Sequence, residues 1–258
     1  MIKKLSLLLL LFVFVVTGCN KVEKDSDIYK SIIERDKLIV GVQFDAKPFG
    51  FLNKEAELNG VDVDIAKEIA KRMLGSEDKV EFKQVSPATR IQSVTTGEVD
   101  LVIATMSITP QRKIIVDFSD PYFIAGQAIV VPQSSKISSL ADLNDKSVIV
   151  VLGTTGEKNL RYFAPAAIVQ GYRNYSNAFK ALKEGKADAL TTDDSIILGF
   201  IMDNKDYKIL SKRLTQEPYG IAFKNSENAH SLKINVNRIL DSMKSDGTLN
   251  KIKKKWGV

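Results

Sequence analysis

One pattern occurs twice along the chain and constrains its fold more than any other feature. A helix-like segment over residues 91–97 ends in glycine and is followed by a buried run at 98–105. A second such segment at 178–185 also ends in glycine, and the run 186–193 follows it. Glycine is common just after a helix because it adopts the left-handed backbone there, and a short apolar run is typical of a buried strand. The repeat predicts two βαβ-rich halves, each with a mainly parallel sheet.

Further elements extend each half. Residues 38–42 form a β-rich run, and an apolar stripe at helical spacing follows around Ile65. Residues 80–85 are expected to add another strand to the first half. The second half gains a strand at 147–152 and a helix after Gly156. Both halves therefore combine strands and helices in the order that an α/β fold requires.

Two extended runs are suited to connect the halves. Residues 120–131 can cross from the first half to the second, and residues 217–223 can return. The last stretch, 232–256, is expected to be helical and to pack on the first half. Two crossings make a hinge with a cleft beside it, and closure around a ligand is the usual use of that layout.

The N-terminus carries an export signal. Two lysines precede an apolar run at 5–16, and a small-residue motif then leads to Cys19. An apolar run of about 12 residues is shorter than the roughly 20 that span a bilayer, but it fits a secretory signal peptide. Cys19 stands at the expected cut, where it would become a lipidated first residue held at a bacterial membrane. An uncleaved anchor or a chance cysteine is the alternative. Residues 20–36 are predicted to be a polar tether with a helical piece around 28–35.

Composition excludes several kinds of chemistry. The single cysteine, Cys19, allows no intrachain disulfide and no cysteine metal site. The single histidine, His230, is expected at the surface of a helix, without the partners of a Ser–His–Asp device or a metal cluster. The net charge of +6 is modest, and the lysine run at 251–255 suits a helix C-terminus. We therefore expect no cofactor, no metal and no nucleic-acid partner.

The first candidate site follows the strand that ends near Thr105. Thr109 suits an N-cap and Pro110 suits the first helical position, so the N–H groups there could hold an anion. The guanidinium of Arg112 matches a carboxylate, and Ser107 adds a hydroxyl. The alternative is a well-capped helix with a surface arginine.

A second candidate site lies at the end of the other half's repeated strand. Asp193 could hold an ammonium group, unless Asp193 or Asp194 merely caps a helix at 195–202. Thr154 and Thr155 bring hydroxyls and backbone N–H groups to another helix start in the same half. Because ligands in parallel sheets bind beyond the carboxyl ends of strands, these groups should meet in the cleft. A carboxylate binder on one half and an ammonium binder on the other describe a clamp for an α-amino acid.

These residues carry a resemblance to a known family. Over residues 37–258 the chain resembles the amino-acid-binding subfamily of bacterial periplasmic-type solute-binding proteins, which feed ABC importers. The resemblance implies the type II two-lobed fold, a monomer and a membrane permease as partner. The motifs that carry it are Gly60–Ala66, Ser107–Arg112, Asp117–Tyr122, Tyr219–Ala222 and Asp246–Trp256.

The resemblance also implies roles for individual residues. The arginine matching Arg112 grips the ligand α-carboxylate, and the aspartate matching Asp193 takes the α-ammonium. Further hydrogen bonds come from the positions matching Thr105, Ser107, Thr154 and Thr155. Arg90 resembles an arginine that acidic-amino-acid binders aim at the side-chain carboxylate, whereas Gln43 stands where several of them carry a second basic residue. Glutamate and aspartate are therefore expected first and glutamine next, with other polar amino acids left open.

The expected function is that of a lipid-anchored importer subunit that binds one L-amino acid and delivers it to a permease. One alternative is an enzyme on the same fold, similar to periplasmic dehydratases, with Asp194 or Glu157 as a general acid. Another is a sensory amino-acid-binding domain acting through a partner. Nothing but the resemblance to the dehydratases favours the enzyme.

The predicted domain boundaries follow from these assignments. Residues 1–18 are the signal peptide and 19–36 the lipidated tether. Residues 37–124 and 218–258 form the first lobe, and 125–217 form the second.

Overall fold

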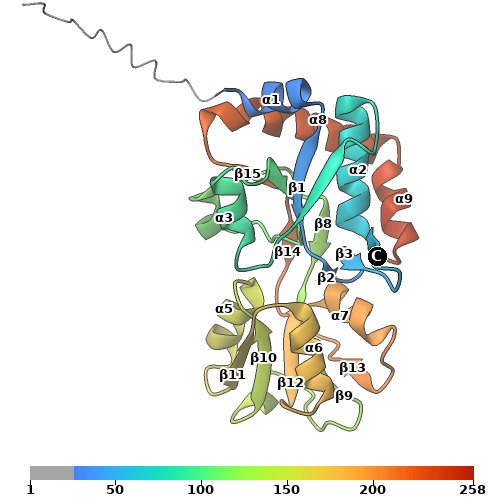
Figure 1. Cartoon of the computed structure of the whole chain (residues 1–258). Coiled ribbons are helices and arrows are strands. Elements are labelled where there is room, and N and C mark those ends of the chain that lie inside the picture. Colours follow the sequence, from blue (N-terminus) through green and yellow to red (C-terminus); the bar gives the residue numbers. More distant parts are fainter. Residues whose placement is uncertain (1–25) are drawn as a thin grey trace, which may run out of the picture.

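The computed structural model describes residues 26–258 and contains two lobes joined by two strands (Figure 1). It has the two-lobed α/β architecture that the sequence predicts. The first lobe is built on a sheet in the order β5-β1-β6-β15-β7, with β1 (Leu38–Val42), β5 (Val80–Gln84), β6 (Leu101–Val102), β7 (Val116–Phe118) and β15 (Ala222–Lys224). The second has the order β11-β10-β12-β9-β13, with β9 (Gln127–Pro132), β10 (Ser147–Val151), β11 (Ile168–Tyr172), β12 (Ala189–Asp193) and β13 (Tyr207–Ile209).

Helices pack around both sheets, and a small antiparallel sheet extends the first lobe toward the second (Figure 1). The first lobe holds α1 (Ile28–Arg35), α2 (Val61–Leu74), α3 (Arg90–Thr95), α4 (Pro110–Lys113), η2 (Glu227–Ala229), α8 (His230–Ser245) and α9 (Thr248–Lys255). The second holds η1 (Ala141–Leu143), α5 (Thr155–Phe163), α6 (Tyr175–Lys183) and α7 (Asp194–Ile201). The small sheet consists of β2 (Asp45–Ala46), β3 (Gly50–Leu52) and β4 (Leu58–Asn59).

Each large sheet is parallel where the repeat predicted it and antiparallel where the chain crosses between lobes. β1 pairs in parallel with β5 and β6, and β10 pairs in parallel with β11 and β12. β15 and β9 run antiparallel to their neighbours. The reason is that both strands start at the hinge and run away from it, whereas the parallel strands end there. Because β7 pairs only with the reversed β15, and β13 only with the reversed β9, four of the five strands in each sheet run in the same direction. The prediction of mainly parallel sheets is therefore confirmed, with one reversed strand in each lobe.

The C-terminal stretch 232–256 is helical, as predicted, and consists of two helices. α8 ends at Ser245 and α9 begins at Thr248. Gly247 between them has a φ of 78°, a left-handed conformation that glycine adopts without strain. α8 packs on α1 and α2, and α9 packs on α2, so both cover the first lobe as expected.

Only part of the N-terminal prediction falls on residues that the structure describes. The signal peptide 1–18 and Cys19 lie outside these residues. Within the predicted tether, α1 forms over the expected residues 28–35 and packs on α8, and its Ile32 is fully buried. This helical part is therefore built into the first lobe. None of the helices within 26–258 is both long and apolar enough for a membrane crossing.

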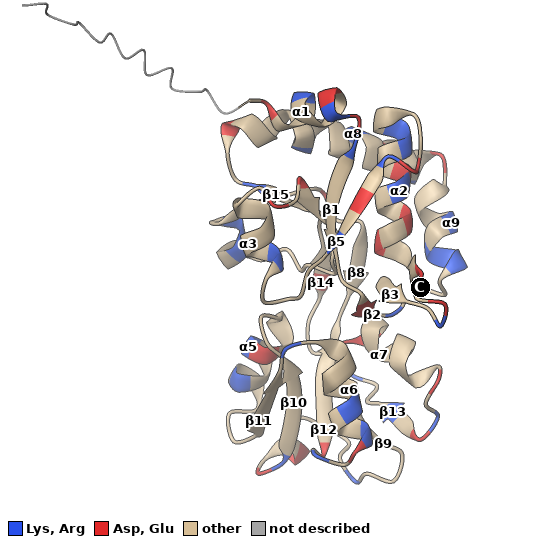
Figure 2. Cartoon of the chain, in the orientation of Figure 1, with Lys and Arg blue, Asp and Glu red and all other residues tan. Residues whose placement is uncertain are grey.

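Charged residues of both signs are spread over the two lobes (Figure 2). His230 is the first residue of α8 and is exposed, as predicted. The lysines near the C-terminus lie in the last turns of α9, where positive charge complements the helix dipole.

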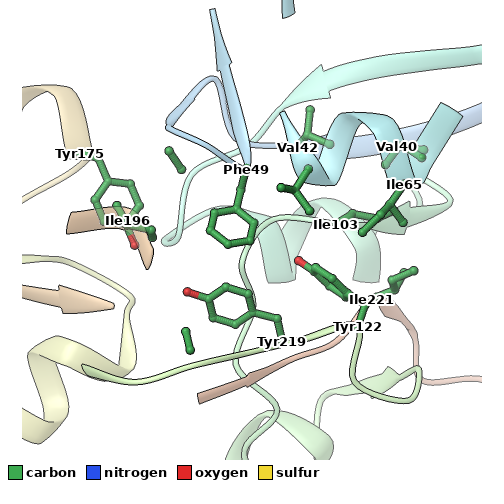
Figure 3. Close-up of a cluster of buried hydrophobic side chains, with 14 of the residues drawn as sticks. Val40, Val42, Phe49, Ile65, Ile103, Tyr122, Tyr175, Ile196, Tyr219 and Ile221 are labelled. Atoms are coloured by element: carbon green, nitrogen blue, oxygen red, sulfur yellow. The ribbon is translucent and has the colours of Figure 1, made fainter. Parts of the chain in front are cut away.

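An aromatic cluster fills the hinge between the lobes. β8 (Phe123–Ala125) and β14 (Glu217–Tyr219) form the two crossings as an antiparallel pair. The ring of Tyr219 packs against Phe49 with centroids 5.5 Å apart and against Tyr122 with centroids 6.2 Å apart. Figure 3 shows the Tyr219 hydroxyl directed toward Tyr175 and Ile196 of the second lobe. The hinge is thus part of a continuous buried core that joins both lobes.

The two lobes touch each other outside the hinge. Asp45 Oδ2 in the first lobe accepts the backbone N–H of Ser176, at the start of α6, at 3.0 Å. Lys47 Nζ lies 2.6 Å from Asp203 Oδ2. Gly199 in α7 approaches the backbone of Lys47 so closely that a Cβ on this glycine would lie 2.2 Å from the Lys47 carbonyl oxygen. The structure is therefore a closed conformation, and Gly199 permits that closure.

We predict that Gly199→Ala opens the cleft while leaving each lobe folded. The added methyl group needs the Lys47 backbone to move, and overpacking of this kind costs about 1–3 kcal/mol. Because the clash exists only between closed lobes, that cost shifts the population toward the open form by roughly 5- to 150-fold. Small-angle X-ray scattering should report a larger radius of gyration.

Gly156→Ala is the matched control, because a Cβ there would lie 3.4 Å from its nearest atom, Oγ1 of Thr154 in the same lobe. An unchanged radius of gyration for Gly199→Ala would contradict the prediction.

Candidate functional site

The predicted site residues gather where the strands of both lobes end at the hinge. Gln43 follows β1, and Thr105 comes three residues after β6. From the second lobe, Thr154 follows β10 and Asp193 ends β12. These are carboxyl ends of parallel strands, which is where open α/β sheets bind ligands.

A single peptide group organises the first-lobe half of the site. The carbonyl oxygen of Ala104 accepts a hydrogen bond from Gln43 Nε2 at 3.1 Å and another from Arg90 Nη1. The N–H of the same peptide, on Thr105, donates to Asp62 Oδ2 at 3.1 Å. Asp62 Oδ1 in turn accepts from the Tyr122 hydroxyl at 2.8 Å. Gln43 and Arg90 are therefore held side by side on one carbonyl.

Several buried polar atoms in this half have no partner within the described residues. They include Gln43 Oε1, Arg90 Nε and Thr105 Oγ1. Thr105 also has a φ of 47°, a left-handed conformation that is unfavourable for a residue with a branched side chain. Because a buried polar atom without a hydrogen bond is costly, an unpaired group of this kind calls for a functional explanation.

Arg112 spans the two lobes and is not a surface arginine. Its Nη1 donates to the Ser107 carbonyl at 2.7 Å, and its Nη2 donates across the cleft to the Gly153 carbonyl at 3.1 Å. Burial, followed by the nearby Arg90 charge, lowers the pKa of Arg112 to about 9. A bound anion would offset both effects.

The helix at this position is shorter than a helix-dipole anion site needs. α4 has a single turn from Pro110 to Lys113, and the Thr109 side chain accepts the backbone N–H of Arg112 at 3.2 Å. Thr109 is thus the predicted N-cap, but it occupies one of the N–H groups that the sequence analysis left free for an anion. The guanidinium of Arg112 is therefore the group in this segment that can bind an anion. Ser107 is buried, and its backbone bridges to Tyr219.

The two adjacent aspartates at the end of β12 have separate tasks. Asp194 Oδ1 accepts the backbone N–H groups of Ser195 at 2.8 Å and Gly126 at 3.1 Å. Asp193 occupies the N-cap position of α7, yet its side chain makes no capping bond and accepts the Tyr219 hydroxyl at 2.5 Å. Burial raises the pKa of Asp193 to about 7. Asp193 is therefore the carboxylate of the pair that is free to meet a cation.

Thr154 and Thr155 line a cavity of about 410 Å³ together with Arg112, Gly153 and Glu217. The Thr154 hydroxyl caps α5 by accepting the N–H of Glu157 at 3.3 Å, and it donates to the Val151 carbonyl at 2.7 Å. The Thr154 hydroxyl therefore also stabilises the start of α5, a role that was not predicted from the sequence. Thr155 is the first residue of α5.

Two residues of the site were missed from the sequence, Asp62 and Tyr219. Asp62 lies three residues before Ile65 on the buried face of α2 and is itself fully buried. A carboxylate in phase with an apolar stripe is the signal that could have revealed it. Tyr219 gave no comparable signal, because a tyrosine in an extended run is most often a packing residue. No cluster of metal-ligating side chains occurs within residues 26–258.

Comparisons with known proteins show the family of the chain. Residues 38–258 match the family described as bacterial extracellular solute-binding proteins, family 3. The glutamine-binding protein GlnH of an ABC transporter in Bacillus subtilis is 46% identical over 91% of this chain and 86% of its own length. A glutamine-binding protein of Geobacillus stearothermophilus is 45% identical over 79% and 76%. An ancestral arginine-binding protein solved with bound glutamine superposes with a TM-score of 0.80 at 43% identity, covering 86% of this chain and 98% of that one.

We predict that Asp193→Asn stabilises the ligand-free fold at pH 8 by up to about 4 kcal/mol. The folded-state pKa of Asp193 is raised from 3.8 to about 7, so the folded state binds its proton more tightly than the unfolded state. Stability is therefore lost as pH rises from about 4 to about 7, and the loss is complete at pH 8. Because asparagine cannot ionise, the free energy of unfolding of the variant does not fall in this way as pH rises.

Urea unfolding at pH 8 and at pH 4 measures the effect, which should largely vanish at pH 4. An equal difference between variant and wild type at both pH values would show that the charge is not its cause.

Proposed function

Because the chain belongs to family 3 of the bacterial extracellular solute-binding proteins, we propose that it binds L-glutamine in the closed cleft and delivers it to the permease of an ABC importer. Its place of action is then outside the cytoplasm. The observation that carries the ligand assignment is the unpaired acceptor of Gln43 beside the unpaired donor of Arg90.

The two ends of an amino-acid backbone match the two free charges of the cleft. Arg112 is the partner proposed for the α-carboxylate, since its planar guanidinium can bind both oxygens at once. Asp193 is the partner proposed for the α-ammonium. Thr105, Ser107, Thr154 and Thr155 lie near these charges and are proposed to add hydrogen bonds through backbone or hydroxyl groups. A zwitterion would supply the opposite charge to each of the two buried groups.

The side-chain end of the cleft favours an amide. Ala104 O is an acceptor only, so the Gln43 amide must turn its Nε2 toward that carbonyl and leave Oε1 unpaired. Arg90 offers its Nε as a donor beside it. A glutamine side chain has both an oxygen to accept from Arg90 and an N–H to donate to Gln43. A glutamate carboxylate would bring a second acceptor against Oε1. The proposal therefore ranks glutamine ahead of glutamate and aspartate, the reverse of the order expected from the sequence.

The enzyme alternative finds no support at the site. A dehydratase needs a positioned general acid. Asp194 already accepts two backbone N–H groups and pairs with Arg213, and Glu157 accepts the N–H of Gly153. Neither carboxylate is free to serve, and the relatives described above are named as binding proteins.

We predict that glutamine raises the melting temperature of the purified protein more than any other of the twenty L-amino acids. A ligand that binds only the folded state stabilises it in proportion to RT ln(1 + [L]/Kd). Calorimetric titration should then give a lower Kd for glutamine than for glutamate. A larger shift with glutamate than with glutamine would refute the ligand assignment.

Gln43→Leu should weaken glutamine binding by about tenfold, because one hydrogen bond to the ligand amide is lost. Gln92→Leu is the matched control, since Gln92 lies on α3 with its side chain exposed. If both variants bind glutamine with equal affinity, Gln43 does not contact the ligand.

We also propose that Cys19 is lipidated and holds the protein at the outer face of the cell membrane, where it acts as a monomer. Cys19→Ala should move the protein from the membrane fraction to the soluble extracytoplasmic fraction, since stable anchoring requires the acyl chains. Fractionation with immunoblotting measures this. A variant that stays in the membrane fraction would instead indicate that the apolar leader remains attached as the anchor.

A further inference from the structure

Asp62 is a fully buried carboxylate that the fold itself does not explain. It lies in the first turn of α2, on the buried face of the helix, whose other residues are apolar. Burial of a charge is expensive unless hydrogen bonds and an opposite charge accompany it. Asp62 has both: the Thr105 N–H and the Tyr122 hydroxyl donate to it, and the Arg90 cation acts on it.

The hydrogen bonds of Asp62 hold the group that positions the ligand-reading side chains. Its Oδ2 accepts the Thr105 N–H, whose peptide carbonyl holds Gln43 and Arg90. Its Oδ1 accepts the Tyr122 hydroxyl. Asp62 is therefore one peptide group away from both Gln43 and Arg90, without lying among the ligand-facing residues.

The charge of Asp62 also acts on Arg90. The Arg90 cation is among the groups that hold the pKa of Asp62 down, against a burial that raises it to about 7. Arg90 is itself buried, which lowers its pKa, and Asp193 is the carboxylate that opposes this shift. Glu217, another buried acid at the cleft, acts on Arg112 and Asp193.

We infer that Asp62 determines the specificity of the cleft for an uncharged side-chain amide, by offsetting the charge of Arg90 and fixing the peptide that orients it. This inference rests on the proposed binding of glutamine. The α-carboxylate of the ligand is matched by Arg112 and the α-ammonium by Asp193. The charges of Arg90, Asp62 and Glu217 then remain, and Asp62 offsets the positive charge of Arg90, which lies one peptide group away. Glutamine adds no further charge, whereas glutamate would add a negative charge that no unpaired cation of the cleft receives.

Asp62→Asn isolates the charge from the hydrogen bonds. The asparagine oxygen can still accept from Thr105, and its amide can donate to the Tyr122 oxygen. Calorimetric titration at pH 8 with glutamine and with glutamate gives the ratio of the two dissociation constants. We expect the preference for glutamine over glutamate to fall by at least tenfold, because Arg90 becomes free to pair with a carboxylate.

Asp64→Asn is the matched control. Asp64 lies in the same turn of α2 but accepts hydrogen bonds from Lys255 and Trp256 at the C-terminal end of α9. The same change of charge there should leave the ratio unaltered.

Arg90→Gln provides a second test, which is needed if Asp62→Asn does not fold. Once the Arg90 guanidinium is removed, no cation offsets the negative charge of Asp62, which then repels a ligand carboxylate. The preference for glutamine over glutamate should therefore rise, although both affinities fall. An unchanged ratio in Asp62→Asn, or a lower one in Arg90→Gln, overturns the inference while leaving glutamine binding intact. A wild-type protein that binds no glutamine, or that prefers glutamate, overturns the proposed function and this inference together.

Discussion

The carbonyl oxygen of Ala104 receives two donors from two different elements, and the recognition end of the cleft depends on this shared acceptor. A carbonyl has two lone pairs, so Gln43 and Arg90 together saturate it. Neither side chain can turn away without leaving a buried donor unpaired. The left-handed backbone at Thr105 turns the next N–H toward Asp62, and the hydrogen bond to Asp62 helps offset the cost of that conformation. Rigid positioning of two side chains thus arises from one strained peptide rather than from a large packed surface.

Closure of the lobes has its own contacts, separate from any ligand. Asp45 receives an N–H at the start of α6, where negative charge is favourable, and Arg112 donates to Gly153 from the opposite lobe. Each contact is modest, because it replaces hydrogen bonds to water in the open form. Their sum sets the fraction of closed molecules, and that fraction scales the apparent affinity for any ligand that needs the closed form. Affinity and selectivity are therefore controlled by different residues.

The chain's local patterns predicted most of the fold and the charged ends of the cleft, for identifiable reasons. Thr109, Arg112 and Asp193 stand out because turn chemistry and charge mark strand ends. The direction of β9 and β15 could not be read in this way, since it depends on which lobe the chain has just left. Asp62 and Tyr219 were missed because their roles come from contacts 43 and 26 positions away in the sequence, with Thr105 and Asp193. The ranking of ligands depended on the orientation of one amide, which no spacing rule determines.

In the cleft the pKa of Asp193 is raised and the pKa of Arg112 is lowered. These opposite shifts favour a ligand that carries both a positive and a negative charge. Burial shifts Asp193 toward its neutral acid and Arg112 toward its neutral base, so each group is held in a charged state at a cost to folding. An anion alone would lower the cost of charging Arg112 but raise the cost of charging Asp193. A cation alone would have the opposite effects. A zwitterion relieves both at once. A ligand that carries both charges at the right separation therefore offsets both shifts, whereas a ligand with one charge offsets only one of them.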